Sequence, residues 1–239
     1  MTAKTGSKLP FADDLPALGE RKTLAEEAAD TLRELILLEK LPPGKPVPER
    51  ELAAALGISR TPMREALRLL EVEGLIEYSA TRRPRVADPT LTELAQYLSV
   101  LGVLEGLAGE QACENATDGE IAAIGALCRK MEQTSNGDDP LEFFRTDMAF
   151  HRSIVEASRN PPLIETHRQY NARLWRARFI SSRRRPDRPG TLRQHKEVYE
   201  AIARRDGEAC AAALRRHLRT TVKNIEKTRA ERDGKESDA

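Results

Sequence analysis

Residues 48–78 read PERELAAALGISRTPMREALRLLEVEGLIEY, and this stretch decides the fold of the first third of the chain. Pro48 can occupy the first turn of a helix, because its missing N–H has no intrahelical partner there. Gly57 is suited to end that helix, and Ser59 can cap the next helix after a short turn. The second helix then leads into a strand that ends at Tyr78. The pattern predicts a helix-turn-helix with a following strand.

The second of these helices has two different faces. Apolar residues recur at helical spacing on one of them: Met63, Ala66, Leu67 and Leu70. On or beside the opposite face, near the N-terminal end, lie Arg60, Thr61, Arg64 and Arg68. Arginine forks and hydroxyl groups at this end are what a helix needs to contact base edges and phosphates in a major groove. We therefore expect this helix to bind DNA.

The wider segment resembles a known module. The run PERELAAALGISRTPMREALRLLEVEGLI, with its SRTPMREAL core, is similar to the winged helix-turn-helix of GntR-type transcription regulators. The preceding LRELILLEKLPPGKPVPE is similar to that family's first helix and Pro-Gly turn, and SATRRPRVADP takes the place of its wing. Family wings usually carry glycine at the tip, where this chain has Thr81-Arg82-Arg83-Pro84. The resemblance covers residues 22–88 and implies sequence-specific DNA binding.

Within this module we expect seven residues to contact DNA: Arg50, Ser59, Arg60, Thr61, Arg64, Arg82 and Arg83. Arg60 and Arg64 are candidates for base edges, and Arg50 is a candidate for a base or a phosphate. Ser59 and Thr61 are expected to position phosphates, whereas the two wing arginines act through their charge. For Arg64, the alternative is a surface ion pair with a neighbouring glutamate.

Length and composition predict two domains in a mainly α protein. The 239 residues leave room for a second domain of about 150 residues. Hydrophobic content of 39% with only 4% aromatics suits helices packed through Leu and Ala. Because the net charge is only +1, DNA binding requires that basic residues cluster locally on one surface. We expect a disordered arm over residues 1–21, a helical domain over 89–226 and a charged, disordered tail over 227–239.

The cysteines and the hydropathy pattern indicate the cellular compartment. Cys113, Cys128 and Cys210 show neither a CxxC motif nor disulfide-like spacing, so we expect reduced core residues. No apolar run approaches the roughly 20 residues that cross a bilayer, and the N-terminus does not resemble a signal peptide. We therefore expect a cytoplasmic protein with no membrane partner.

Every segment after Thr90 reads as a helix. Capping boxes at Thr90 and Thr117 begin the first two helices. Caps and breaks divide the region into helices at about 91–115, 118–134, 140–158, 162–182, 191–205 and 207–226. A basic loop is expected at 183–190. Because no segment alternates between polar and apolar residues, the region is predicted to be an antiparallel helical bundle.

Histidines carry the chemistry of this second region. Asp147 and His151 lie four residues apart on one stripe of their helix, and His195 and His217 lie on apolar stripes of two later helices. Burying Asp147 unpaired costs several kcal/mol, which a divalent cation shared with three neutral imidazoles would remove. Imidazole and carboxylate suit Zn, Ni, Mn or Fe(II). The alternative is a hydrogen-bonded polar core without a metal.

Three segments of this region resemble the FCD effector domain of the fatty-acid-regulator branch of the GntR family: FFRTDMAFHRSIVEASRNPPL, LRQHKEVYEAIARRDGEACAAALRRHL and VLEGLAGEQACENAT. Many members of that domain bind a metal through one Asp and three His. Those positions fall on Asp147, His151, His195 and His217, whereas His167 matches none of them.

One position departs from the family pattern. The family often has an arginine, thought to meet an effector carboxylate, where this chain has Leu101. We therefore expect either a different, less acidic effector or a cation supplied from elsewhere, with Arg145 and Arg178 as the candidates.

The resemblance implies a sequence-specific transcription regulator rather than an enzyme. We expect a repressor whose operator binding is controlled by a small metabolite, expected to be an organic acid, in the metal-containing helical domain. We also expect a homodimer on a double-stranded operator with two half-sites, since one recognition helix reads only a few base pairs. The alternatives are the same regulator without a metal, and a helical metalloenzyme that uses open coordination positions.

Overall fold

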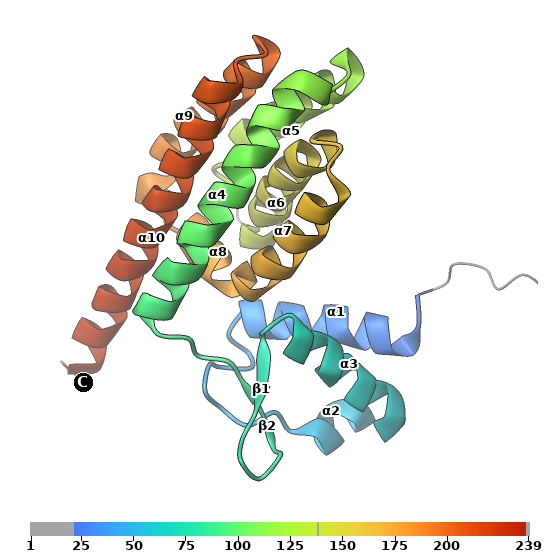
Figure 1. The fold of residues 1–239 in the computed structure, drawn as a ribbon. Coiled ribbons are helices and arrows are strands. Elements are labelled where there is room, and N and C mark those ends of the chain that lie inside the picture. Colours follow the sequence, from blue (N-terminus) through green and yellow to red (C-terminus); the bar gives the residue numbers. More distant parts are fainter. Residues whose placement is uncertain (1–21, 138, 238–239) are drawn as a thin grey trace, which may run out of the picture.

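The N-terminal module is a winged helix-turn-helix, as predicted. The computed structural model describes residues 22–137 and 139–237, so the arm predicted over residues 1–21 lies outside the described residues. The elements of the module are α1 (Leu24–Leu37), α2 (Glu49–Ala55), α3 (Arg60–Val72), β1 (Ile76–Tyr78) and β2 (Pro84–Val86) (Figure 1). The helix-turn-helix is formed by α2 and α3, and the two strands form the wing.

Local signals explain where these helices begin and end. Thr23 and Glu26 form a capping box at the start of α1. Gly57, with a φ of 67°, adopts the left-handed conformation that ends α2. Ser59 occupies the N-cap position of α3, but its hydroxyl makes no cap hydrogen bond. Ser59 is thus the N-cap residue, as predicted, but not through its side chain. Pro62, the third residue of the helix, has no N–H to donate to it.

The core of the module joins α1, α3 and the wing. Its buried residues include Ala29, Leu32, Ile36, Met63, Ala66, Leu67, Leu70, Leu75, Ile76 and Val86. The predicted apolar stripe of α3 is thus fully buried against α1. This packing leaves the arginine-bearing face of α3 in solvent.

The wing is a short antiparallel hairpin. Ile76 pairs with Val86 across its base. In the turn, the N–H of Arg82 donates to the carbonyl oxygen of Ser79 at 2.8 Å, and the N–H of Ser79 donates to the carbonyl oxygen of Arg83 at 3.0 Å. Arg82 has a φ of 55°, a left-handed conformation that is costly for a residue other than glycine. The tip therefore adopts a glycine-like backbone conformation at an arginine.

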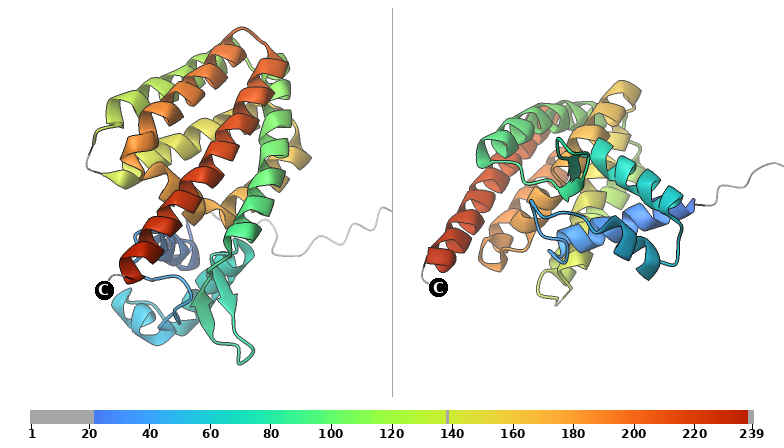
Figure 2. Two further views of the ribbon diagram at one scale, coloured as in Figure 1. Left: turned by 90° about the vertical axis from the view of Figure 1, so that its left-hand side faces the viewer. Right: turned by 90° about the horizontal axis from the view of Figure 1, so that it is seen from below.

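The C-terminal domain is an all-helical bundle (Figures 1 and 2). Its helices are α4 (Leu91–Asn115), α5 (Asp118–Thr134), α6 (Pro140–Ala157), α7 (Pro161–Arg173), α8 (Trp175–Ser182), α9 (Arg188–Ala203) and α10 (Gly207–Ser237). Capping boxes at Thr90 and Thr117 begin α4 and α5, as predicted. Among the described residues, no helix combines the length and apolar character needed to cross a membrane.

The longest packing contact of the bundle joins α4 and α10, which run side by side (Figures 1 and 2). Gly109 on α4 permits their close approach. A Cβ atom at this position would lie 2.6 Å from Cδ1 of Leu214 and 2.7 Å from Sγ of Cys210. Cys113, Cys128 and Cys210 are buried, free cysteines, in line with the predicted core role.

Two predictions for the middle of the bundle need correction. The helix expected over 162–182 is interrupted at Leu174, which ends α7 and caps α8. The interruption lets Leu174 pack inside the bundle, while the next residue, Trp175, packs against the winged module. The loop expected over 183–190 contains a 3-10 turn (Arg185–Asp187) and the first residues of α9.

The disordered tail predicted over 227–239 is wrong for residues 227–237, since α10 continues as a helix to Ser237, and the last two residues lie outside the described ones. This extension has no apolar stripe, and its contacts with the rest of the protein are polar. Arg184 pairs with Glu231 at 2.7 Å, and Lys227 lies 3.3 Å from Asp187. Arg229 donates to the backbone carbonyl oxygen of Pro89, just before α4.

The two domains meet through α8. Trp175, its first residue, packs against the core of the winged module, and its ring lies 4.9 Å from that of Phe144 in the bundle. Arg176 pairs with Glu39 of the winged module at 2.9 Å. The start of α8 is therefore held between the winged module and the interior of the bundle.

Candidate metal centre and DNA-binding face

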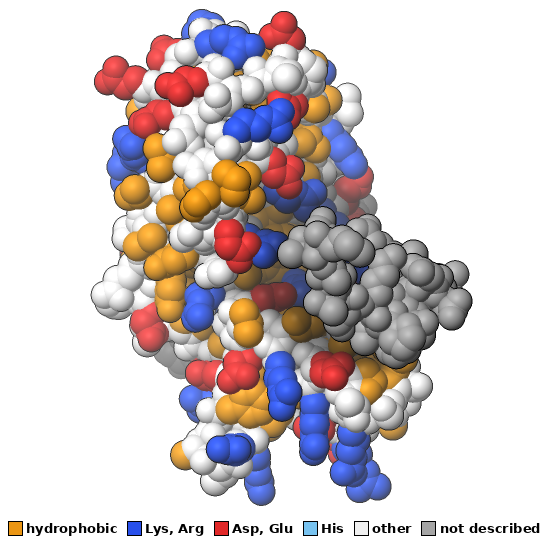
Figure 3. Space-filling model, turned by 45° about the vertical axis from the view of Figure 1, so that its right-hand side comes forward, with side chains coloured by type: hydrophobic (Ala, Val, Ile, Leu, Met, Phe, Trp, Pro, Cys, Tyr) orange, Lys and Arg blue, Asp and Glu red, His pale blue; other side chains and the backbone are white. Residues whose placement is uncertain are grey.

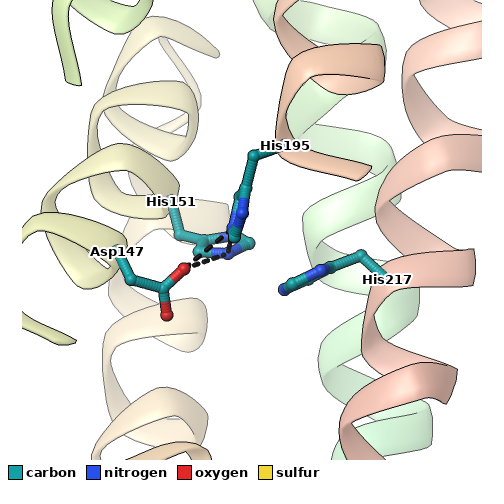
Figure 4. Close-up of side chains that lie close together, drawn as sticks. All are labelled: Asp147, His151, His195 and His217. Atoms are coloured by element: carbon teal, nitrogen blue, oxygen red, sulfur yellow. Dashed lines mark hydrogen bonds and ion pairs between the residues drawn. The ribbon is translucent and has the colours of Figure 1, made fainter. Parts of the chain in front are cut away.

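Four polar side chains converge inside the bundle (Figure 4). Asp147 and His151 lie one turn apart on α6, His195 comes from α9 and His217 from α10. All four are at most 5% exposed, and one ligand atom from each lies within 4.8 Å of those of the other three. The structure thus brings together the four residues that the sequence predicts to bind a metal.

The closest contacts join one carboxylate oxygen and two imidazole nitrogens. Oδ1 of Asp147 lies 2.8 Å from Nε2 of His195 and 3.6 Å from Nε2 of His151. The two Nε2 atoms are 3.3 Å apart. Metal–ligand bonds of about 2.0–2.2 Å place neighbouring ligand atoms roughly 3.0–3.5 Å apart. The separations of these three atoms therefore suit a single ion, whereas the four ligand atoms together, with that of His217, lie within 4.8 Å of one another.

The buried carboxylate gives a second test of fit. Despite its short contacts, Oδ1 of Asp147 has no partner with hydrogen-bond geometry among the described residues. A buried oxygen in this state costs free energy that a bound cation would recover. One carboxylate and three imidazoles form a donor set that Zn, Ni, Mn or Fe(II) accepts. The residues present therefore fit a divalent metal ion.

Outer contacts orient two of the imidazoles. Nδ1 of His217 lies 3.2 Å from Oε1 of Gln194 in hydrogen-bond geometry, whereas Nδ1 of His151 lies 2.9 Å from Oε2 of Glu105 without a hydrogen bond between these two atoms. Such contacts on the far ring nitrogen direct Nε2 toward a metal. His167 contacts the other oxygen of Glu105 at 3.4 Å and does not join the cluster.

The electrostatics of the cluster keep its carboxylates ionised. Burial alone would raise the pKa of Asp147, but its contacts with His151 and His195 hold that pKa well below its usual range. Burial and the charges of the neighbouring imidazoles hold the pKa of His217 well below its usual range. Burial opposes protonation of His151, yet Glu105 raises its pKa, so a metal would compete with a proton there.

Of the two predicted effector arginines, the structure brings one to the cluster. Arg178, on α8, is 3% exposed and donates to Oε1 of Glu105 at 2.8 Å and to Oδ1 of Asn171 at 2.8 Å. Its Nη2 has no hydrogen-bond partner in the described part of the chain. Arg145 is instead exposed and pairs with Glu34 of α1.

A small cavity lies beside the cluster. Its lining includes Asp147, Arg178 and His217, and its volume is about 20 Å³. That space holds about one water molecule or one ion. An organic effector bound here would therefore have to displace the surrounding side chains.

Glu105 and Gln194 are site residues that the sequence reasoning missed. Glu105 is buried on α4, one turn after the buried Leu101 and one turn before the buried Ala108. A single acid on an otherwise apolar stripe is a signal that could have identified it, because buried carboxylates need partners. Gln194 stands next to His195 in sequence but reaches His217 on another helix, which no local pattern indicates.

Lys and Arg side chains project into solvent at the end of the molecule that the winged module forms (Figure 3). The exposed residues there include all seven that the sequence predicts: Arg50, Ser59, Arg60, Thr61, Arg64, Arg82 and Arg83. Within the described residues, the guanidinium groups of four of these arginines make no ion pair or hydrogen bond, and Arg64 is the exception. Unpaired arginines on one face are suited to contact phosphates and base edges.

Arg64 has a partner that the sequence did not indicate. Its Nε lies 2.9 Å from Oε1 of Glu49 on α2, although its side chain is 63% exposed. The predicted alternative placed this ion pair within α3. The pair instead braces the two helices of the helix-turn-helix.

Two family models match the chain. The model of the bacterial regulatory proteins of the gntR family matches residues 24–86, and the FCD domain model matches residues 96–220. The Glc operon transcriptional activator of Escherichia coli strain K12 is 30% identical over 229 residues, which cover 86% of this chain and 90% of that protein. The transcriptional repressor NanR of Citrobacter rodentium is 30% identical over 230 residues, with 83% and 84% covered.

Solved structures share the fold. E. coli McbR/YncC superposes with a TM-score of 0.76 at 21% identity and covers 87% of this chain and 99% of its own. A GntR regulator from Rhodococcus sp. RHA1 gives a TM-score of 0.71, with 85% and 97% covered.

A winged helix-turn-helix joined to an FCD bundle defines a DNA-binding transcription regulator rather than an enzyme. The chain belongs to the GntR family of bacterial regulatory proteins and carries an FCD domain. The relatives include both an activator and a repressor, so the family alone leaves the direction of regulation open.

Proposed function

We propose that this regulator is controlled by a small organic acid that binds at a metal ion in the bundle. The observation that carries this proposal is the buried cluster of Asp147 and three histidines with Arg178 beside it. A divalent ion supplies a positive charge that binds a carboxylate or hydroxyl oxygen. The spare donor on Nη2 of Arg178 supplies a second contact for an anion.

The position of Arg178 supports a link to DNA binding. Arg178 and Trp175 lie one turn apart on the short helix α8, and Trp175 packs against the core of the winged module. An effector that displaces side chains around the small cavity would move Arg178, and with it the start of α8. The proposed outcome is a change in how the winged module is held, with release of the operator as in a repressor.

The proposed DNA-binding residues are the seven exposed side chains of the winged module named above. The proposed domain boundaries are 22–88 for the winged module and 89–226 for the helical domain. Arg60 is assigned to a base edge, while Arg82 and Arg83 are assigned to phosphates. Because Arg64 pairs with Glu49, its base contact would first require this exposed pair to open.

A homodimer is the proposed assembly. Val100, Val103 and Leu107 lie three and four residues apart on α4 and are 40%, 62% and 38% exposed. This apolar stripe is suited to a second copy of the chain. A dimer would place two recognition helices on the two half-sites of an operator. The proposed location is the cytoplasm, where operator DNA is accessible.

Metal analysis with a DNA-binding assay tests the proposal. We expect roughly one divalent ion per purified chain, loss of the ion in chelator, and recovery with added Zn or Ni. Organic acids should then shift operator binding of the metal-loaded protein and fail to shift that of the stripped protein. An effector response that is unchanged after metal removal would favour the metal-free alternative.

A further inference from the structure

A second polar cavity lies apart from the metal cluster, at the junction of the two domains. Its volume is about 710 Å³, and its lining runs from Glu39 of the winged module across α8 and the start of α9 to Glu231 on α10. Pro140, Ile180 and Pro186 give it an apolar wall. Sites for small molecules measure about 300–1,000 Å³. The cleft is therefore large enough for a small metabolite.

Arginines outnumber carboxylates in this cleft. Its described lining includes five arginines: Arg176, Arg183, Arg184, Arg188 and Arg229. Two carboxylates, Glu39 and Glu231, belong to the same lining, and two more just outside it pair with lining arginines, Asp187 with Arg184 and Asp88 with Arg229. Guanidinium groups bind carboxylates and phosphates through paired hydrogen bonds. The lining is therefore suited to an oxyanion with more than one negative charge.

Aromatic rings hold two of these arginines in place. The guanidinium carbon of Arg188 lies 4.3 Å from the centre of the Phe143 ring, and that of Arg183 lies 5.5 Å from the centre of the Phe179 ring. Stacking of this kind fixes the plane of a guanidinium group. Arg183 is thereby oriented for an anion, whereas both terminal nitrogens of Arg188 already donate to the carbonyl oxygens of Ser135 and Ser182.

Arg176 has an unmet donor at the wall of the cleft. This residue is 9% exposed, and its Nη2 donates to Oε1 of Glu39 at 2.9 Å. Its Nε has no hydrogen-bond partner among the described residues. A buried N–H without an acceptor costs free energy, which an oxyanion accepting from Nε would recover.

Glu39 is a partner that an anion can replace. Its side chain is 47% exposed, so its ion pair with Arg176 is open to solvent on one side. Its backbone has a φ of 58°, a conformation unusual for a residue other than glycine. The sharp turn after α1 therefore places the carboxylate of Glu39 at one end of the cleft.

We propose that the cleft binds a small oxyanion with at least two negative charges, which competes with Glu39 for Arg176. A phosphate ester and a polycarboxylate share the required chemistry. Glu39 belongs to the winged module and Arg176 to the bundle. Binding of the anion therefore breaks the ion pair between the two domains and forms a contact between the anion and the bundle. The cleft therefore links anion concentration to domain contact without using the metal cluster.

Calorimetric titration of the full chain with inorganic phosphate, at constant ionic strength, tests the site. Arg176→Gln and Arg183→Gln should each weaken phosphate binding about tenfold, the equivalent of one charge-assisted hydrogen bond. Glu39→Gln should tighten it several-fold, because the competing carboxylate is removed. Arg168→Gln is the matched control, since Arg168 is exposed and pairs with Glu165 outside the cleft. Titration with succinate in the same proteins distinguishes a phosphate ester from a dicarboxylate as the natural class.

The variant Glu39→Gln is decisive, since a purely structural arginine cluster predicts no gain in anion affinity. Unchanged or weaker phosphate binding by Glu39→Gln would overturn the proposal, as would the absence of saturable binding in the wild type. The measurement should be repeated in His195→Ala. Binding that persists there supports a site separate from the metal cluster, and binding that disappears assigns the anion to the cluster. If Arg176→Gln fails to fold, Arg183→Gln and Glu39→Gln still decide the outcome.

Discussion

The exposed face of the winged module and the buried cluster of Asp147 and three histidines use charged side chains in opposite ways. On the winged module, Arg60 is exposed and makes no ion pair among the described residues. In the bundle, Arg178 is 3% exposed and pairs with the buried Glu105 at 2.8 Å. An exposed charge in water contributes little to stability and stays available for a partner, whereas a buried charge depends on its neighbours. Substitutions in the two regions should therefore affect different quantities.

The largest effect on stability is expected from Arg178→Leu. It leaves the carboxylate of Glu105 buried without its guanidinium partner, which should lower the free energy of unfolding by about 3–5 kcal/mol. Chemical denaturation measures this change. The double variant Arg178→Leu/Glu105→Gln should recover part of the loss, because no buried charge is then left unpaired. Equal stability of the single and double variants would contradict the pairing.

Loss of the metal should have the next largest effect. His217→Ala removes a proposed ligand, so the protein should lose its ion and about 3–4 kcal/mol of metal-dependent stability at an ion concentration of about 1,000 times Kd. Metal analysis and thermal unfolding with and without chelator measure both effects. His167→Ala is the matched control, since His167 is buried but contacts Glu105 instead of the cluster. A metal content that falls equally in the two variants would remove His217 from the ligand set.

On the DNA-binding face, Arg60→Ala should leave folding unchanged and cost about 1–3 kcal/mol of operator affinity. Specificity should relax at one base pair in each half-site, whereas Arg83→Ala should weaken binding to all sequences alike and reduce the salt dependence. Binding titrations on operator and random DNA at several salt concentrations separate the two roles. Equal losses on both DNAs for Arg60→Ala would assign it to phosphates.

The smallest effect is expected at the tip of the wing. Arg82→Gly relieves the left-handed backbone of a residue other than glycine and should raise the free energy of unfolding by about 1 kcal/mol. The same change removes a positive charge, so DNA binding should weaken for all sequences. Arg83→Gly serves as the control, because it removes a charge without relieving this strain. A destabilised Arg82→Gly would mean that the arginine makes a contact that offsets the strain.

Local patterns predicted the elements and half of the candidate site. The capping boxes of α4 and α5 and the stripe of α3 involve residues three and four positions apart, and such spacing determines direction on one helix. Asp147 and His151 were predicted to point together for the same reason. In contrast, the continuation of α10 past residue 226 is accompanied by polar contacts of Lys227, Arg229 and Glu231 with distant segments, which composition alone does not indicate.

The sequence by itself determined which face of each helix is buried and which residues carry charge, because these follow from periodicity and residue type. Only the tertiary structure decided which faces meet. It brought His195 and His217 to Asp147, placed Arg178 rather than Arg145 beside them, and added Glu105 from α4. The physical reason is that the distance between side chains on different helices depends on packing and loop geometry, for which spacing within one helix carries no information.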